Sequence, residues 1–303
     1  MTSTRRPMIT TADGTRRESF GAAEWGLVTF LAVTWGASFL FIDIALESLS
    51  PGVITWLRIA LGATALALVP AARGPVPVES LPRIVLLGLT WVAIPFTLFP
   101  IAQQWIESSL AGILNAAMPL FTAAIAALLL RRLPRHIHAF GLVLGFVGVV
   151  LVTLPSWGDD ASTVTGILLV LLATVLYGFS VNIAVPLQQE SGALPVVLRT
   201  QLVATVATIP YAVAGLGDSS IDPAGLGAVF VLGVFGTGVA LAVMAALVGR
   251  VGATRGGVAI YFVPVVAVIL GLVFRDDSIA PLAILGMVVV LAGAYLASRR
   301  EAA

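Results

Sequence analysis

The sequence contains no cysteine and no lysine, and charged residues of every kind are scarce. Only 10% of the 303 residues are charged, whereas 59% are hydrophobic. Without cysteine the chain can form no disulfide, no thiol nucleophile and no cysteine-based metal site. Soluble globular proteins carry about 25% charged residues, so this chain has too few to cover a surface that faces water. We therefore expect most of its surface to face lipid.

Catalytic groups are also sparse. Both histidines, His136 and His138, fall in one basic loop, so no serine–histidine dyad can form. Residues Gly215–Asp218 match the GxGD string of intramembrane aspartyl proteases, but no second helix-borne aspartate is available to share the proton. The basic residues are scattered in short clusters, so the net charge of +1 indicates no nucleic-acid partner. We expect no enzymatic activity, no metal and no cofactor; a membrane-embedded enzyme is the less favoured alternative.

Ten hydrophobic runs are long enough to cross a membrane, since a spanning helix needs about 20 mostly apolar residues. They extend over Trp25–Leu46, Pro51–Ala72, Ile84–Trp105, Leu110–Leu130, His138–Leu154, Thr165–Leu187, Leu194–Val213, Ala224–Val248, Gly256–Phe274 and Ala280–Ser298. The runs are about twice as long as a barrel strand and do not alternate, so strands are not expected. The sequence predicts an all-α membrane protein of ten transmembrane helices, preceded by a cytoplasmic tail over residues 1–24.

The arginines indicate how these helices are oriented, because cytoplasmic loops carry an excess of basic residues. With the N-terminus in the cytoplasm, thirteen of the 16 arginines fall on the cytoplasmic side. They are Arg5, Arg6, Arg16, Arg17, Arg73, Arg83, Arg131, Arg132, Arg135, Arg250, Arg255, Arg299 and Arg300. Arg275 falls on the outer side, and Arg58 and Arg199 lie inside runs. This distribution predicts a multi-pass protein of the inner (cytoplasmic) membrane with both termini in the cytoplasm.

The two halves of the sequence resemble each other. Trp35–Ser38 in the first run is echoed by Tyr177–Ser180, and Leu57–Arg58 is echoed by Leu198–Arg199. Further matches share an offset of 145 residues: Gly88 with Gly233, Gly112 with Gly257, Pro119 with Pro264, Gly141 with Gly286, and Gly148 with Gly293. Five helices are an odd number, so the second copy must enter the membrane upside down. We expect two inverted five-helix repeats, residues 25–154 and 163–298, an architecture of transporters whose site lies between the halves.

Several weak motifs stand at matching places in the two halves. They are Trp35-Gly36-Ala37-Ser38-Phe39, Arg58, Pro119 and Gly141, and then Gly178, Ser180, Arg199, Pro264, Gly286 and Gly293. Together with the topology, they resemble the drug/metabolite transporter superfamily, and more narrowly its EamA-type ten-helix exporters. The resemblance covers nearly the whole chain and implies export of small metabolites, often amino acids, through a central cavity built from both halves. The acidic residue that this family often has after the fourth and ninth helices is matched by Asp277 but replaced by Arg132 in the first half.

Eight side chains within the runs are candidates for lining this cavity and binding the solute. They are Trp35, Ser38, Phe39, Trp91, Asn115, Tyr177, Ser180 and Tyr261. The aromatic ones lie mid-helix, away from the interfacial belts where Trp and Tyr usually sit, so they can stack on a solute. The polar ones can form hydrogen bonds with it. Packing between helices is the alternative for each of them.

Two prolines and two arginines complete the candidate site. Pro119 and Pro264 each free a backbone carbonyl within a helix and are candidates for gating bends, with static kinks as the alternative. Arg58 and Arg199 lie well inside hydrophobic runs, where a charge costs at least about 2.5 kcal/mol. Each can bind a solute carboxylate or can snorkel to a helix end about 10 Å away. Asp43 and Glu47 are candidate partners for Arg58.

Two absences narrow the class of solute. No acidic residue lies deep in the runs, as a small-multidrug-type cation/proton antiporter would need, and no midplane cluster of basic residues suits a phosphate or nucleotide sugar. A neutral or zwitterionic metabolite remains, with amino acids favoured and alternating access as the mechanism; a multidrug or other-metabolite exporter is the alternative. The glycine face Gly141, Gly145 and Gly148 favours packing within one chain, so we expect a monomer, with a homodimer left open.

Overall fold

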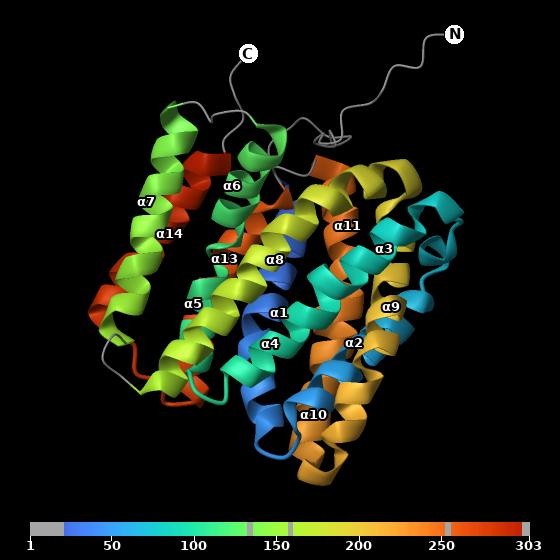
Figure 1. Ribbon diagram of the computed structural model, residues 1–303, viewed down its shortest axis with the longest axis horizontal. Coiled ribbons are helices and arrows are strands. Elements are labelled where there is room, and N and C mark those ends of the chain that lie inside the picture. Colours follow the sequence, from blue (N-terminus) through green and yellow to red (C-terminus); the bar gives the residue numbers. More distant parts are fainter. Residues whose placement is uncertain (1–20, 132–135, 157–159, 252–255, 299–303) are drawn as a thin grey trace.

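The computed structural model describes residues 21–131, 136–156, 160–251 and 256–298. In these residues the chain forms helices joined by short connections, and no strand is present (Figure 1). The elements are α1 (Ala22–Leu46), α2 (Pro51–Ala67), η1 (Pro70–Arg73), η2 (Val78–Ser80), α3 (Leu81–Leu87), η3 (Gly88–Ala93), α4 (Ile94–Ala102), α5 (Ser108–Asn115), α6 (Met118–Leu130), α7 (His136–Thr153), η4 (Leu154–Ser156), α8 (Ala161–Ser191), α9 (Ala193–Ala214), η5 (Leu216–Asp218), α10 (Pro223–Gly233), η6 (Val234–Val239), α11 (Ala240–Val251), α13 (Val258–Phe274) and α14 (Pro281–Ser298).

Ten apolar helical segments of the described chain correspond one to one with the ten predicted runs. Seven have 21 residues or more, and α2, α13 and α14 have 17 or 18. Four spans are composite: η2, α3, η3 and α4 form the third, α5 and α6 the fourth, α7 and η4 the fifth, and α10, η6 and α11 the eighth. The prediction of an all-α membrane protein is confirmed. The second span is shorter than predicted, because α2 ends at Ala67 and the chain continues as η1.

The start of the first span and the end of the last span lie on the same side of the bundle. In Figure 1, α1 begins and α14 ends at the top, and the connection from α1 to α2 lies at the bottom. We call these the upper and lower sides. An even number of spans requires this arrangement. The N-terminal tail predicted over residues 1–24 lies mostly outside the described residues.

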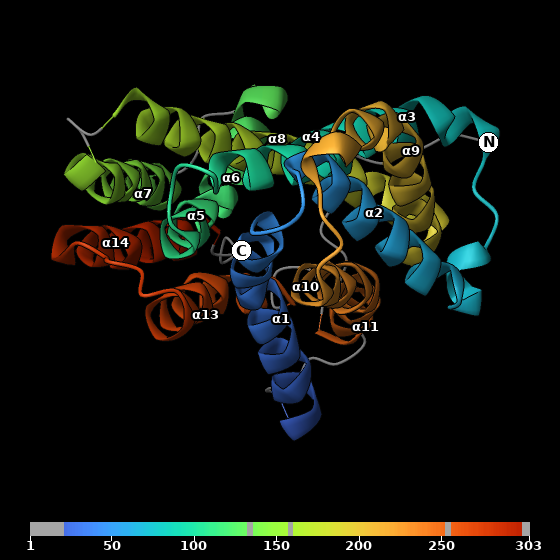
Figure 2. The same ribbon diagram turned by 90° about the horizontal axis from the view of Figure 1, so that it is seen from below.

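The helix contacts are symmetric between the two halves of the chain. In the first half α1 packs along α13 of the second half, and correspondingly α8 packs along α6. Equivalent helices also pair directly: α2 lies against α9, and α7 lies against α14 (Figure 2). Exchanging the halves therefore reproduces these contacts, as the internal repeat in the sequence leads one to expect.

The third and eighth spans share a second sign of the repeat. Each contains a π-helical segment, η3 and η6, at the corresponding place. In η6 the Thr237 hydroxyl donates a hydrogen bond to the carbonyl of Leu232, five residues earlier, at 3.1 Å. Single π-helical turns inside α-helices occur frequently at functional sites.

Glycines allow α7 and α14 to approach closely. A Cβ atom added to Gly293 would lie 2.3 Å from the backbone nitrogen of Gly145, and one added to Gly148 would lie 2.5 Å from that of Val290. No side chain fits at such distances, so small residues are required at this crossing. The glycine face predicted on the fifth helix thus packs within the chain.

Candidate functional site

Arg58 lies two turns inside α2 and is only 7% exposed. Its Nε donates a hydrogen bond to Oγ1 of Thr237 in η6 at 3.2 Å. Its guanidinium carbon lies 4.0 Å from the centre of the Phe96 ring, which is a cation–π contact. Arg58 therefore joins the second, third and eighth spans, and it interacts at longer range with the Tyr177 hydroxyl of the sixth.

Within the described ranges, no carboxylate lies at ion-pair distance from Arg58. The predicted partners, Asp43 and Glu47, both pair with Arg275 instead. That prediction is wrong because both carboxylates stand at the lower end of α1, beside the connection from α13 to α14. A buried charge without a neutralising partner is costly in a membrane. Arg58 can therefore accept an anionic group from a ligand.

Three aromatic rings form a row across the first, third and sixth spans. The centroids of Phe39 and Phe99 are 5.6 Å apart with the rings edge to face. The centroids of Phe99 and Tyr177 are 6.0 Å apart with the rings stacked. Each such pair is worth about 0.5–1.5 kcal/mol beyond area burial. Because Tyr177 is also the neighbour of Arg58, this apolar row meets the buried charge at one end.

Trp35 and Ser38 lie on α1 beside the eighth span. The Trp35 indole Nε1 donates a hydrogen bond to the carbonyl of Gly236 at 3.2 Å. The Ser38 hydroxyl donates to the carbonyl of Thr34 at 3.0 Å, within its own helix. Trp35 thus contacts the same π-helical segment as Arg58, whereas the Ser38 hydroxyl already has a backbone partner.

Ser180 and Trp91 lie where the third span meets the second half. Ser180 is fully buried, and its Oγ lies 2.9 Å from Oγ1 of Thr90. Thr90 donates its own proton to the carbonyl of Leu86, so Ser180 is the donor between the two hydroxyls. Trp91 is half-buried and packs against an apolar cluster that includes Val196. Both side chains therefore contribute to packing between the third, sixth and seventh spans.

Asn115 and Tyr261 belong to the equivalent fourth and ninth spans. Asn115 is the last residue of α5, and its Oδ1 is buried without a hydrogen-bond partner in the described part of the chain. The Tyr261 hydroxyl donates to the carbonyl of Ala294 in α14 at 3.2 Å. Of the eight candidates, three lie around Arg58: Trp35 contacts η6, Tyr177 interacts with Arg58 electrostatically, and Phe39 belongs to the row of rings that ends at Tyr177. Tyr261 instead joins α13 to α14.

The two candidate gating prolines differ in their surroundings. Pro119 is the second residue of α6 and follows a break at Ala116–Ala117. Pro264 lies buried inside α13, which continues through it without interruption. The fourth span is therefore broken and the ninth is not, although the prolines occupy matching positions. Bending at either proline during function stays a prediction.

Arg199 does not reach the surroundings of Arg58. Its Nη1 donates to the carbonyl of Pro195, one turn earlier in α9, at 3.1 Å. The side chain is partly exposed near the start of the helix. This geometry agrees with the alternative in which Arg199 snorkels to the helix end.

Sequence reasoning missed four residues of the site. They are Phe96, Phe99, Gln201 and Thr237. Gln201 is fully buried, and neither amide atom has a partner among the described residues. Its Oε1 and the Cγ2 of Thr237 both lie within 3.0 Å of the point where a Cβ on Gly62 would stand. The glycines on either side of Thr237 could have indicated from the sequence where the eighth span crosses α2, because glycine allows two helices to approach closely.

Polar contacts close the lower side. Arg275 pairs with Asp43 and, at 2.5 Å, with Glu47. Asp277 accepts hydrogen bonds from the Ser108 hydroxyl at 3.0 Å and from the Ser109 N–H at 2.9 Å. We call Asp43, Glu47, Ser108, Ser109, Arg275 and Asp277 the lower clasp. It ties together the first, fourth and ninth spans.

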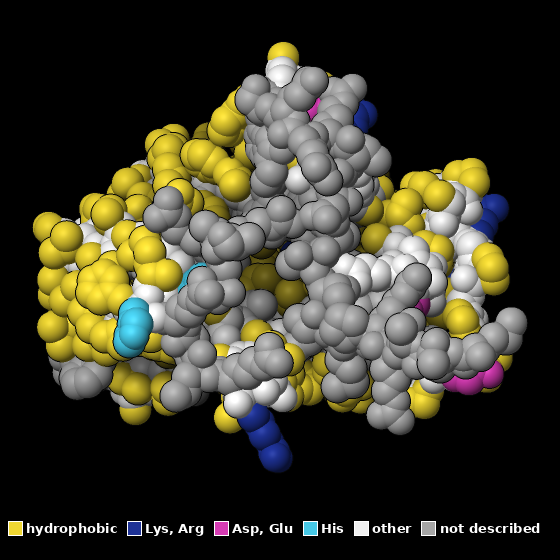
Figure 3. All heavy atoms as spheres, turned by 90° about the horizontal axis from the view of Figure 1, so that it is seen from above, with side chains coloured by type: hydrophobic (Ala, Val, Ile, Leu, Met, Phe, Trp, Pro, Cys, Tyr) yellow, Lys and Arg dark blue, Asp and Glu magenta, His cyan; other side chains and the backbone are white. Residues whose placement is uncertain are grey.

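The upper side is hollowed near its centre, and hydrophobic side chains are visible at depth in Figure 3. This hollow and the lower clasp lie at opposite ends of the bundle.

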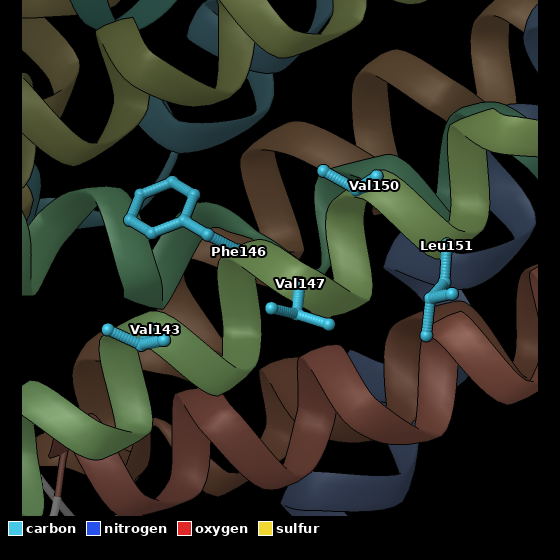
Figure 4. Close-up of a pocket in the computed structure, with 5 residues that line it drawn as sticks. All are labelled: Val143, Phe146, Val147, Val150 and Leu151. Atoms are coloured by element: carbon cyan, nitrogen blue, oxygen red, sulfur yellow. The ribbon is translucent and has the colours of Figure 1, made fainter.

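A second hollow lies on the surface of α7. It is lined by Val143, Phe146, Val147, Val150 and Leu151, all on one helix (Figure 4). Val143 is 64% exposed and Val150 is 49% exposed, so this groove faces outward. Its hydrophobic lining suits lipid rather than a polar ligand.

Comparison with known proteins accounts for this architecture. The sequence profile of the EamA-like transporter family matches residues 25–154 and again residues 164–299. The chain belongs to the EamA-like transporter family. It is a multi-pass membrane transporter. The resemblance read from the sequence motifs is thereby confirmed.

Similar proteins are also transporters by name. An uncharacterized transporter of Archaeoglobus fulgidus is 22% identical over 92% of this chain and 99% of its own length. A probable terminal-alkyne amino-acid exporter of Streptantibioticus cattleyicolor is 25% identical over 92% of this chain and 94% of its own length. The uncharacterized inner membrane transporter YedA of Escherichia coli is 26% identical over 88% of each chain.

A solved crystal structure shares the fold with this EamA chain. It superposes with a TM-score of 0.61 at 16% sequence identity, covering 91% of this chain and 97% of the other. At that identity the likeness shows the fold alone.

Proposed function

We propose that this transporter exports small neutral or zwitterionic metabolites, with amino acids as the preferred class. The observation that carries the proposal is Arg58, a buried guanidinium at the junction of three spans without a carboxylate partner in the described residues. A solute carboxylate supplies the missing negative charge in a low-dielectric site. The aromatic side chains Phe96 and Tyr177 beside it offer an apolar wall for the rest of the solute.

The proposed mechanism is alternating access between two repeats, residues 25–154 and 163–298. The halves rock about the surroundings of Arg58, with bending at Pro119 and Pro264. The lower clasp closes one side while the other is hollowed, which supports a state open to the upper side. We assign the upper side to the cytoplasm, because Arg73, Arg83 and Arg250 belong to it by the predicted orientation.

Relatives support the finer part of this proposal only by analogy. The Streptantibioticus protein is named as a probable amino-acid exporter, and the Escherichia coli protein as an inner membrane transporter. We extend export and the inner membrane to this chain on that basis. Cytoplasmic termini are proposed from the distribution of the arginines, and we expect the monomer to be the transporting unit.

Counterflow in proteoliposomes tests the proposal. Vesicles containing the purified protein are loaded with one unlabelled compound, and uptake of the labelled compound is measured. The panel pairs each amino acid with the amine that lacks its carboxylate. We expect counterflow for at least one amino acid and less than a tenth of that rate for its amine. Equal rates for both members of every pair would refute a carboxylate-binding Arg58.

A further inference from the structure

The fourth span is broken at its middle, unlike its counterpart in the second half. Helix α5 ends at Asn115 and α6 begins at Met118. The intervening Ala116 and Ala117 are buried. The break therefore lies inside the bundle, where backbone polar groups need partners other than water.

Pro119 leaves a carbonyl at this break without its regular donor. In a helix the carbonyl of Asn115 would accept from the N–H of residue 119, which is proline. The carbonyl also belongs to the C-terminal end of α5, where the helix dipole is negative. A cation or a hydrogen-bond donor is the group that stabilises such an end.

A proline also frees a backbone carbonyl in the third span, but the surroundings of that carbonyl differ. Pro100 lies inside α4 and frees the carbonyl of Phe96. That carbonyl lies 3.1 Å from the Thr55 hydroxyl, which shares its single proton between the carbonyls of Phe96 and, at 2.7 Å, Pro51. The structure thus supplies a shared donor at Pro100, and Pro119 is the contrasting case.

One side-chain oxygen without a partner lies at the break. Oδ1 of Asn115 is buried and has no hydrogen-bond partner within the described residues. The unsatisfied side-chain atom at this place is therefore an acceptor.

The chemistry of these acceptors selects the ligand. Neutral carbonyl and amide oxygens suit a hard cation or an ammonium group. The described break contributes no carboxylate of its own, and divalent ions are usually bound through carboxylates. In membrane transporters, unwound carbonyls and half-helix C-terminal ends coordinate coupling cations. A compact monovalent cation fits this site best.

We propose that the break in the fourth span binds a compact monovalent cation through the backbone carbonyl and Oδ1 of Asn115. This site deepens the proposed function on which it rests: the cation is the ammonium group of the solute or an inorganic ion that is coupled to its movement. Asn115 and Arg58 both lie about 10 Å along their spans from the lower side, at the 1.5 Å rise per residue. A cation site therefore shares the depth of the carboxylate site.

Thermal unfolding of the purified protein in detergent tests this site without any transport assay. The protein is titrated with sodium chloride, methylammonium chloride and choline chloride, with choline as the ionic-strength control, because ligand binding to the native state raises the unfolding temperature. We expect a saturable rise with sodium or with methylammonium, and none with choline. Saturation with methylammonium assigns the site to the solute ammonium, and saturation with sodium alone assigns it to an inorganic ion.

Two variants locate the binding. Asn115→Leu removes Oδ1 and should weaken the apparent affinity about tenfold or more, the loss expected for one hydrogen bond to a charged group. Pro119→Ala supplies the N–H that occupies the Asn115 carbonyl, and it should also weaken binding. Pro100→Ala is the matched control and should leave the affinity unchanged, because Thr55 already serves that carbonyl.

The proposal is overturned if the three salts give the same titration, or if both variants retain the wild-type affinity. These results are independent of the counterflow assay. Loss of the cation effect with intact discrimination between amino acids and amines would remove this site and leave the proposed function standing.

Discussion

Nε of Arg58 in α2 lies 3.2 Å from Oγ1 of Thr237 in η6, and this hydrogen bond joins the second span to the eighth. The Thr237 hydroxyl itself donates a hydrogen bond to the carbonyl of Leu232. The hydroxyl therefore acts as acceptor and donor at once and fixes the guanidinium against the π-helical segment.

Thr237→Val should destabilise the protein and release Arg58. Valine matches threonine in shape but leaves the buried guanidinium without its acceptor, which costs about 1.5–3 kcal/mol for a bond to a charged group. Thermal or denaturant unfolding measures the loss. The control is Thr200→Val, because the buried Thr200 hydroxyl bonds only to the Val196 carbonyl of its own helix in the described residues. Equal losses in the two variants would contradict a special role for Thr237.

Arg275→Gln should open the lower side. It removes the ion pairs to Asp43 and Glu47, and half-exposed pairs of this kind are worth about 0.2–1 kcal/mol each. The equilibrium between the closed and the open lower side should therefore shift several-fold toward the open state. The chain has no cysteine, so a single cysteine at Met118 reports access. Faster labelling by a membrane-impermeant maleimide from the outer face is expected, and an unchanged rate would show that the clasp does not hold the gate.

Glu107→Gln should raise stability near neutral pH and flatten its pH dependence. Burial raises the pKa of the Glu107 carboxyl above its ordinary value of 4.5; the N–H of Ser278 lowers the pKa and Asp277 raises it. A carboxyl with a raised folded-state pKa favours the folded state while it is protonated. Its stabilisation is present below 4.5 and is lost as pH rises through the folded pKa.

Unfolding temperatures measured between about pH 4 and 8 check this sign. The wild type should lose stability relative to the Gln variant as pH rises. An opposite trend would contradict the sign.

Gly293→Ala should be destabilising although alanine is the better helix former. The new Cβ would lie 2.3 Å from the backbone nitrogen of Gly145, so α7 and α14 must separate, at a cost of about 1–3 kcal/mol. Gly227→Ala in α10 is the control, since a Cβ there meets nothing within 4 Å. That variant should gain up to about 1 kcal/mol from helix propensity. Unfolding that ranks the two variants the other way would contradict the close packing.

The fold was largely predictable from the sequence because lipid imposes a minimum length on each apolar run. The ten runs, their helical nature and the family followed from run length, arginine placement and weak repeated motifs. The starts of α2 and α10 were also readable, as Ser50-Pro51 and Asp222-Pro223. Their side chains accept hydrogen bonds from the first turn, as caps do.

Details of the site were less predictable because they depend on contacts between distant spans. The partner of Asp43 could not be found from the sequence. Arg58 was proposed because it is near along the chain, whereas Arg275 comes close only through the position of the α13–α14 connection. Pro119 and Pro264 look equivalent at an offset of 145 residues, yet only the fourth span breaks, since Asn115 and two alanines precede Pro119 where α13 has a continuous apolar run. Phe96 and Thr237 gave no polar or aromatic pattern that distinguishes a site from packing.

Counterflow by Arg58 variants tests the central claim most directly. Arg58→Gln removes the charge, and Arg58→Lys retains it without the planar fork. Arg199→Gln removes the equivalent arginine, whose bond is local. We predict that amino-acid counterflow falls at least tenfold in Arg58→Gln and by a smaller factor in Arg58→Lys. The Arg199→Gln variant should transport at nearly the wild-type rate. All three variants should yield similar amounts of folded protein. Wild-type counterflow in folded Arg58→Gln protein would contradict the central claim.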